Sequence, residues 1–562
     1  THTLTVAAGG RVAGANDDFH LNWALSAGEL QINNVMSLGT GAAEVSDGAS
    51  IVIVGAEGEF TNALTGAGGL RVTNGANVEL AGSNALKGGL TVLDKSAVSA
   101  SGDIYEHIGT GPIALDGTAV FTLTEGTDVD SWNWDRKVSG KGNLTFAREG
   151  LDSQDLSFTD GTLKNFGGNL TLDNWIIRLS TVNGQTATFD ELSGSKIGDI
   201  TLKNSARADV TGDVSLAGKN LWLENTASLT FNGVGVPGAS THDNAHITVD
   251  ELHLGSGFNI DLGISNASVK SEDLIKHDKT SDSTLISVAT ALEGIFGEVK
   301  DGTVTVNGEE TIGKTIRFGI DQGSGSVLEE SGDVGDAIYG YDILKETVNS
   351  HDKLQISYSL EGIDIGSRKT LVLNGVESDA EGEDEDSTLG VYLTGKGSLR
   401  IAGNTVRLSK TEHGNDYLGT TTVSSGATLY AEEGTLGQTA RLTTESGART
   451  YIEGDNTVKG FTLAADGQLV IGDISTMGDK SDVTLTISSL TDKTTPSDQI
   501  NHLSGQLHGN GVLKVVGNGQ YDEGVDADLT IHGSQSNFYG DLVLENGAWV
   551  DICLLYTSDA AD

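Results

Sequence analysis

Two stretches of this chain combine residue types that could do chemistry. The first alternates carboxylates and tryptophans over residues 128–135. Indole rings can stack on sugar rings, and neighbouring carboxylates can hydrogen-bond sugar hydroxyls or act as acid and base in glycoside cleavage. The candidate ligand-binding residues are Asp128, Asp130, Trp132, Trp134 and Asp135. A structural alternative stands beside this one: the first two aspartates cap a turn, and the tryptophans belong to the strand that leads into the next repeat.

The second stretch is an acidic run from Asp379 to Asp386. Calcium takes oxygen ligands, so the run is a candidate calcium site. It lacks the Gly-Gly-x-Gly-x-Asp nonapeptide that builds calcium into β-rolls, and we therefore expect a solvated loop.

Motifs for other chemistry are missing from the sequence. No His-Glu-x-x-His pair, Walker loop or serine-nucleophile loop occurs, and histidines such as His413 and His532 are predicted to be solvated loop residues. The single cysteine, Cys553, excludes a disulfide framework. We expect no catalytic site, no metal and no cofactor. A polysaccharide-active enzyme remains the less favoured alternative.

The net charge of −45 limits the classes of partner. Nucleic-acid binding needs clustered Lys and Arg, and anionic membrane surfaces also repel an acidic chain. The sequence therefore predicts that no nucleic acid is bound.

Short turns recur along the chain, and each leads into an alternating strand. The turn glycines are Gly48, Gly75, Gly426, Gly447, Gly467 and Gly547. Three of them follow one another at intervals of 21 and 20 residues. A turn with two or three short strands every twenty-odd residues is typical of a β-solenoid coil.

A longer signature with two boxes occurs four times. The first box, apolar-x-Gly-x-Gly-x-Leu, spans residues 64–70, 138–144, 393–399 and 507–513. The second box begins at Gly88, Gly168, Gly419 and Gly540 and continues into alternating residues. Alternation predicts inward apolar and outward polar side chains, so that Leu399 faces the core and Thr420 faces solvent. The spacing between the boxes varies, which predicts that loops of different length leave the solenoid at the same corner of its coils.

These patterns predict an all-β chain that folds as a right-handed parallel β-helix (β-solenoid). The composition agrees, because 77 glycines serve corners while only 3 prolines interrupt strands. The crossover preference of parallel strands sets the expected hand. With a rise of about 4.8 Å for each coil, roughly 20 to 25 coils would form a rod on the order of 100 Å long. Short helices are expected only near residues 271–276 and 285–295.

Composition divides the chain into four parts. Residues 1–254 are the N-terminal part of the β-helix, and residues 255–390 are a loop-rich, acidic section of the same solenoid or an inserted subdomain. Residues 391–552 continue the β-helix with the two-box repeats. Residues 553–562 continue no repeat and are predicted to be a non-native tail. The opening Thr1-His2-Thr3-Leu4, without an initiator methionine or signal peptide, predicts a fragment of a longer protein.

The third two-box repeat carries a family resemblance. Leu393 to Leu399 followed by Asn415 to Leu429 resembles the passenger-associated repeat of type V autotransporters of Gram-negative bacteria. The segment from Leu354 to Leu373 also resembles their AIDA-type, self-associating adhesin passengers. The resemblance implies a right-handed parallel β-helix displayed outside the cell, at the bacterial surface. It also implies an outer-membrane β-barrel at the C-terminal end of the full-length protein.

The functional expectation follows from this resemblance and from the fold. A long polar surface favours adhesion or self-association, with a host-cell or matrix surface, or another copy of the chain, as partner. The alternative is a structural stalk that presents an N-terminal cargo. Loops of different length along residues 100–135 and 255–390 favour the adhesin, because a stalk needs no such decoration.

Overall fold

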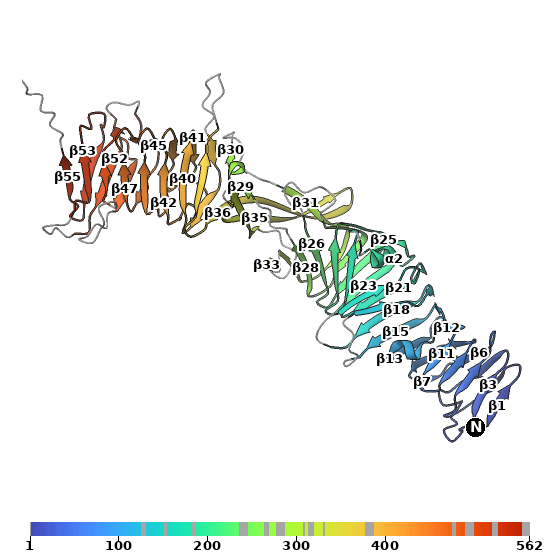
Figure 1. Cartoon of the computed structure of the whole chain (residues 1–562). Coiled ribbons are helices and arrows are strands. Elements are labelled where there is room, and N and C mark those ends of the chain that lie inside the picture. The colour runs from blue at the N-terminus through green and yellow to red at the C-terminus, as the bar shows by residue number, and fades with distance from the viewer. Residues whose placement is uncertain are drawn as a thin grey trace, which may run out of the picture. The chain divides into compact units, whose positions relative to one another are not determined.

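The computed structural model is built almost entirely from short parallel strands, stacked coil upon coil (Figure 1). It describes residues 2–124, 131–150, 154–182, 184, 186–234, 245–263, 269–276, 287–306, 309–312, 320–329, 332–376, 387–474, 479–488, 500–519 and 526–553. The predicted class, a parallel β-helix, is confirmed.

The chain divides into two compact units. Unit 1 comprises Thr1–Ser265, Val288–Ile320 and Asp342–Ser357, and unit 2 comprises Asn266–Ser287, Asp321–Tyr341 and Tyr358–Asp562. Residues 255–390 therefore contribute to both units.

Unit 1 contains four series of stacked strands, here called sheets A to D. Sheet A consists of β1 (Thr3–Val6), β3 (Asn22–Leu25), β5 (Ala43–Val45), β8 (Leu64–Gly66) and β11 (Asn84–Leu86). Sheet B consists of β2 (Gly10–Val12), β4 (Glu29–Ile32), β6 (Ser50–Val54), β9 (Gly69–Thr73), β12 (Gly89–Val92), β14 (Ile113–Leu115), β17 (Val138–Gly140) and β20 (Asn165–Phe166).

Sheets C and D form the larger coils of unit 1. In this unit, sheet C consists of β7 (Glu57–Phe60), β10 (Asn77–Leu80), β13 (Ala97–Ser101), β15 (Thr118–Leu123), β18 (Asn143–Arg148), β21 (Asn169–Asp173), β23 (Asp199–Lys203), β25 (Asp213–Glu224), β27 (His246–Leu254) and β31 (Ser287–Val299). Sheet D consists of β16 (Ser131–Trp134), β19 (Gln154–Phe158), β22 (Trp175–Ser180), β24 (Arg207–Thr211), β26 (Ser228–Asn232), β28 (Phe258–Gly263), β32 (Gly302–Val306) and the antiparallel β33 (Glu309–Ile312).

Unit 2 contains sheets E, F and G. Sheet E consists of β30 (Ile275–Lys276), which is antiparallel to its neighbour, β38 (Ser387–Leu389), β41 (Thr405–Leu408), β43 (Thr428–Ala431), β45 (Arg449–Ile452), β48 (Gln468–Ile471) and β51 (Gln506–Gly509). Sheet F consists of β37 (Thr370–Asn374), β40 (Ser398–Gly403), β42 (Thr420–Val423), β44 (Arg441–Thr444), β47 (Phe461–Leu463), β50 (His502–Leu503), β53 (Leu529–His532) and β55 (Val550–Cys553). Sheet G consists of β46 (Asn456–Val458), β49 (Thr484–Ser488), β52 (Val512–Val516) and β54 (Asp541–Glu545).

The remaining strands are β29 (Val269–Lys270), β34 (Ile320–Glu329), β35 (Gly332–Val348), β36 (His351–Ile365) and β39 (Tyr392–Gly395). Cys553, where the predicted tail begins, is the last residue of β55. The rest of that tail lies outside the described residues.

The predicted inward and outward alternation is confirmed at the tested positions. Leu399 is completely buried, and Thr420 is exposed. Leu399 is aligned with Thr421 of the next coil, and Ile401 with Val423. Inward side chains that repeat at every second residue therefore stack on one another along the interior.

The two boxes of the longer signature occupy the same corner in consecutive coils. The second-box glycine lies against the second glycine of the preceding first box, and a Cβ atom on it would come within 1.8–2.7 Å of that glycine's carbonyl oxygen. The stacked pairs are Gly68 with Gly88, Gly142 with Gly168, Gly397 with Gly419 and Gly511 with Gly540. Only glycine fits this corner, because the coils approach backbone to backbone. The expectation that the loops leave a single corner is wrong. In one copy the long connection runs from β41 to β42, directly before the glycine corner, whereas in another it runs from β52 to β53, directly after the strand that follows the corner.

The helices differ from those predicted. The range 271–276 holds a 3-10 turn (Ser271–Leu274) and β30, whereas the described residues of 285–295 lie in β31. The second expectation is therefore wrong, because β31 is held as a strand by pairing with β27, where Leu292 is aligned with Ile247. Two helices were not predicted: α1 (Ile104–His107) and α2 (Ala187–Gly194). No helix in the described part of the chain is long and apolar enough to cross a membrane.

Candidate binding surfaces

The structure places the two candidate tryptophans inside the core. Strand β16 turns Trp132 and Trp134 inward, where they are 7% and 0% exposed, and turns Ser131 and Asn133 outward. Trp134 packs against Phe121 and Phe146, with ring centroids 5.4 and 4.8 Å apart. A sugar in solution cannot stack on buried rings. The proposed stacking role of these tryptophans is therefore wrong, and they belong to the strand, as the structural alternative held.

The carboxylates of this stretch do not form a site among the described residues. Asp128 and Asp130 lie outside the described residues. Asp135 is exposed and pairs with Arg136 at 2.5 Å, while the Arg136 guanidinium lies 4.6 Å from the centre of the Tyr105 ring. The Tyr105 hydroxyl donates to the Asn133 carbonyl at 2.8 Å and accepts from the Asp135 amide at 3.1 Å. Burial raises the pKa of Tyr105 to about 12, so this neutral hydroxyl acts as a brace between coils.

The other sequence candidates are also placed. The acidic run at 379–386 lies outside the described residues, and no group of three or more His, Cys, Asp or Glu side chains is arranged to hold a metal within the described ranges. His413 is exposed, with its ring centroid 5.1 Å from that of Tyr392. His532 is a half-buried residue of β53 and not a solvated loop residue, and its ring stacks on that of His502 with centroids 6.0 Å apart. Burial, assisted by His532 and Arg441, lowers the pKa of His502.

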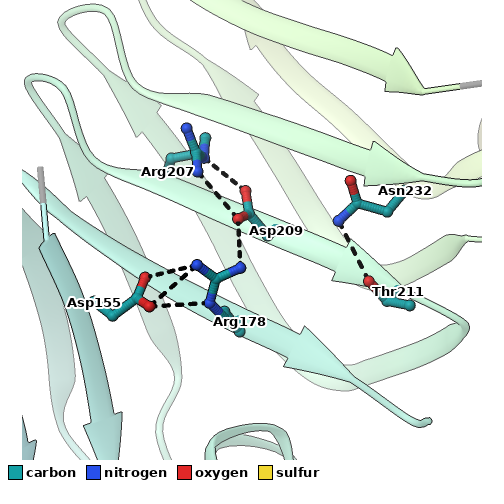
Figure 2. A network of polar contacts seen from close by, with 6 residues as sticks. All are labelled: Asp155, Arg178, Arg207, Asp209, Thr211 and Asn232. Carbon is teal, nitrogen blue, oxygen red and sulfur yellow. Dashed lines mark hydrogen bonds and ion pairs between the residues drawn. The ribbon is translucent and has the colours of Figure 1, made fainter. Parts of the chain in front are cut away.

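The outward face of sheet D carries a charge-balanced network (Figure 2). Arg178 of β22 donates to Asp155 of β19 through Nε at 3.1 Å and Nη2 at 3.2 Å, and its Nη1 reaches Asp209 of β24 at 3.4 Å. Arg207 donates to the same Asp209 through Nε at 2.6 Å and Nη2 at 3.1 Å. The bond to Asp155 raises the pKa of Arg178. Two cations neutralise two anions here, so the network ties three successive coils together and presents no free charge to a ligand.

The same face continues as a column of hydrogen-bonded polar side chains. Asn232 donates to Thr211 at 3.3 Å, and further along Thr303 donates to Asn259 at 2.9 Å and Thr305 to Asp261 at 2.7 Å (Figure 2 shows the first pair). Parallel, in-register pairing causes this repetition, because it stacks equivalent outward positions of neighbouring coils.

The outward face of sheet E carries aromatic and acidic groups. Tyr430 and Tyr451 stack with ring centroids 4.4 Å apart and planes at 12°, and the Arg407 guanidinium lies 4.7 Å from the Tyr430 ring centre. Arg407 also pairs with Glu432 and Glu453. Beside Tyr430 and Tyr451, here called the tyrosine column, is a cleft of about 360 Å³. Its polar lining residues are Lys410, Glu432, Glu433, Glu453, Asp455 and Asp482.

A third outward feature lies on sheet C in unit 1. Trp222 of β25 and His253 of β27 are aligned partners, and their rings stack with centroids 3.6 Å apart and planes at 7°. They line a hollow of about 180 Å³.

Sequence reasoning missed this pair and the tyrosine column, although part of the signal was present. Leu221 and Leu223 flank Trp222, and Leu252 and Leu254 flank His253. The alternation therefore predicts that both rings face outward. Their contact could not be read from the sequence, because it depends on which residues of two unequal coils are aligned.

Comparison with known proteins adds a distant relative. No protein-family model matches the chain. The chain is 23% identical over 388 residues to the uncharacterized protein YuaQ of Escherichia coli (strain K12), a match that covers 66% of this chain and 26% of the relative. The match thus spans about a quarter of the length of that curated relative.

Proposed function

We propose that this chain is part of the passenger of a type V autotransporter, displayed on the surface of a Gram-negative bacterium, and that it acts in adhesion or self-association. The repeat resemblance at residues 393–429 and the parallel β-helix fold support the passenger assignment. The distant match to YuaQ supports relatedness and carries no function of its own.

The in-register columns of outward side chains are the observation that carries adhesion. On sheet F, Thr422, Thr443 and Thr462 are aligned from coil to coil, and on sheet E, Thr405 is aligned with Thr428. A repeated column offers the same contact many times at the coil spacing. Weak contacts made in parallel raise avidity without a deep pocket.

The acidic charge predicts how self-association responds to salt. With a net charge of −45, two copies repel one another at low ionic strength. Added salt or divalent ions screen this repulsion, so association of displayed chains increases with ionic strength.

A structural stalk is the second candidate, and the regular coils around Gly426 and Gly447 favour it. The amide of Gly426 donates to the carbonyl of Gly447 at 3.3 Å, and that of Gly447 to Asp466 at 3.2 Å. Evenly stacked coils of this kind can hold a cargo at a distance without binding anything.

Cell-surface display separates these two functions. Residues 1–552, fused to an outer-membrane anchor, should make cells settle faster or attach to host cells, and settling should increase with salt. The variant under test carries both Tyr430→Glu and Tyr451→Glu on sheet E, and it should settle and attach less than the unaltered chain. Arg11→Glu in unit 1 is the matched control at an exposed position and should settle and attach normally. Deletion of 255–390 is unsuitable, because that section contributes to both units. If the unaltered chain neither settles nor attaches at any salt concentration, the adhesion function fails and the stalk remains.

A further inference from the structure

We propose that the tyrosine column, Tyr430 and Tyr451, is an oxidative cross-linking site, at which a peroxidase with hydrogen peroxide joins the two rings into dityrosine. The product is a covalent staple between the paired strands β43 and β45. This inference goes beyond the proposed function, since the reaction takes place within one chain whether or not that chain promotes adhesion.

The register of sheet E places the two rings face to face. Tyr430 and Tyr451 are aligned partners of parallel strands, so their side chains leave the sheet in the same direction. The ring centroids are 4.4 Å apart and the ring planes lie at 12°. The carbons beside the two hydroxyls thus belong to facing, nearly parallel rings, which is the arrangement from which two phenoxyl radicals couple.

Neighbouring side chains keep the two rings in this arrangement. The Arg407 guanidinium lies 4.7 Å from the centre of the Tyr430 ring and pairs with Glu453, two residues after Tyr451. On the next strand, Tyr451 is aligned with Val470, which is only 3% exposed. Two rings held in one ordered column react with one another without a bimolecular encounter, and this proximity favours the link between them.

The exposure of the tyrosines decides which of them an oxidant can reach. Tyr430 and Tyr451 are half-buried on an outward face, whereas Tyr417 is completely buried. Tyr539 is 51% exposed, and within the described residues its ring stacks on no other. Exposure without stacking leads Tyr539 to links between molecules, while the stacked pair is linked within one chain.

The reaction removes two electrons and two protons from the pair. The peroxidase takes one electron and one proton from each phenol, and hydrogen peroxide is reduced to two molecules of water. The two phenoxyl radicals share their unpaired electrons in a new bond between the carbons beside the hydroxyls. Each of these carbons then releases its hydrogen as a proton, and each phenolic oxygen regains one. The product has therefore lost two hydrogen atoms.

The link constrains the chain between the two coils. It joins positions that are 21 residues apart. A cross-link that closes such a loop reduces the conformational freedom of the unfolded chain, by the same reasoning that applies to disulfides. The oxidised chain should therefore resist unfolding more than the untreated chain does.

The test oxidises the purified whole chain at low concentration with a peroxidase and limiting hydrogen peroxide. Trypsin places Tyr430 in peptide 411–441 and Tyr451 in peptide 450–459. Mass spectrometry should find these peptides joined with the loss of two hydrogen atoms, and the fluorescence of dityrosine should appear. The yield should not depend on protein concentration, because both rings belong to one chain.

Conservative variants identify the two rings. Tyr430→Phe and Tyr451→Phe each keep a ring in the column and remove the hydroxyl that is oxidised, so either variant should lose the linked peptide. Tyr539→Phe, the control at another reachable tyrosine, should keep it. Circular dichroism checks that each variant is folded. After oxidation, the urea midpoint should rise in the unaltered chain and stay unchanged in Tyr451→Phe.

Four results would overturn the inference. The site is refuted if the linked peptide is missing at an oxidant dose that modifies Tyr539, if it survives Tyr430→Phe or Tyr451→Phe, or if its yield rises with protein concentration. The staple is refuted if the linked chain unfolds at the same urea concentration as the untreated chain. Cells that neither settle nor attach would not affect these results, because the reaction is measured on the isolated chain.

Discussion

The interiors of the two units are filled in different ways. In unit 1, rings fill the coils between residues 104 and 180, where Trp134, Phe146 and Trp175 are completely or almost completely buried. In unit 2, several threonines occupy the same kind of position: Thr421, Thr439, Thr444 and Thr450 are all completely buried.

The coils that hold these side chains also differ in length, but length does not distinguish the units as wholes, since Gly68 and Gly88 of unit 1 are 20 residues apart and Gly511 and Gly540 of unit 2 are 29 apart. The stacked corners Gly142 and Gly168 are 26 residues apart, whereas Gly397 and Gly419 are 22 apart. Each interior must be filled, because an interior void forfeits packing contacts. A threonine can occupy an inward position, provided that its hydroxyl finds a partner.

The hydroxyls of unit 2 do find partners. Tyr417 Oη lies 2.6 Å from Thr421 Oγ1, which lies 2.8 Å from Thr439 Oγ1, and Thr439 donates to the Gly419 carbonyl at 2.8 Å. Thr444 and Thr450 pair at 2.7 Å. The comparison teaches that stacking of equivalent inward positions, rather than apolarity alone, is what this fold requires.

The largest expected effect comes from a charge placed inside a short coil. Leu399→Asp introduces an unpaired carboxylate into the stack and should lower the free energy of unfolding by about 4 to 5 kcal/mol. Thr420→Asp, on the outward side of the neighbouring coil, should cost less than about 0.5 kcal/mol. Urea unfolding monitored by circular dichroism compares the two variants. Equal urea midpoints for the two variants would contradict the assignment of Leu399 to the interior and of Thr420 to the surface.

An aromatic deletion tests the long coils of unit 1. Trp134→Ala removes a fully buried ring that packs on Phe121 and Phe146, and should cost about 3 to 5 kcal/mol. Exposed Trp549 provides the matched control, and Trp549→Ala should change stability much less. Differential scanning calorimetry measures the stability of both variants. If Trp134→Ala lost less stability than Trp549→Ala, the packing role of the Trp134 ring would be contradicted.

The stacked glycine corner gives an intermediate effect. At Gly419 a Cβ atom would lie 2.0 Å from the Gly397 carbonyl oxygen, so Gly419→Ala must separate two coils and should cost about 2 to 3 kcal/mol. Gly426 has open space around it and a φ of 81°, so Gly426→Ala meets only backbone strain of about 1 kcal/mol. Denaturant midpoints of the two variants should rank in this order, and the reverse order would refute the close-approach argument.

The smallest effect concerns the hydroxyl chain of unit 2 and depends on pH. Tyr417→Phe removes one buried hydrogen bond and should cost about 1 kcal/mol at neutral pH. Burial raises the pKa of Tyr417 above its ordinary value of 10.0. The unfolded chain therefore releases this proton first, and the contribution of Tyr417 is fully present below pH 10 and is lost as the pH rises above it.

Thermal melts between pH 8 and pH 11 measure this dependence. The unaltered chain should lose stability more steeply above pH 10 than Tyr417→Phe does. Tyr539→Phe is the control, because this side chain is exposed, and it should leave the dependence of the melting temperature on pH unchanged. Parallel curves for all three proteins would mean that Tyr417 ionises as freely as an exposed tyrosine.

The sequence by itself was sufficient for the fold class and for the parity of its strands. Both depend on local information, since alternation with period 2 and glycine at each corner recur within single coils. The inward position of Leu399 and the shared corner of Gly397 and Gly419 could therefore be predicted. Parity also favoured an inward Trp132 and Trp134, because they alternate with Ser131 and Asn133, and the sugar-stacking interpretation overlooked this.

Only the tertiary structure decided which outward residues meet. Arg178 bonds Asp155, 23 residues earlier, and Asp209, 31 residues later, so the interval between stacked positions changes from one coil to the next. Trp222 and His253 are likewise 31 residues apart and are brought together by a register that shifts within β25 and β27. Loop length changes the interval without changing the alternation, and the contacts that could bind a ligand are therefore set by the stacking of coils.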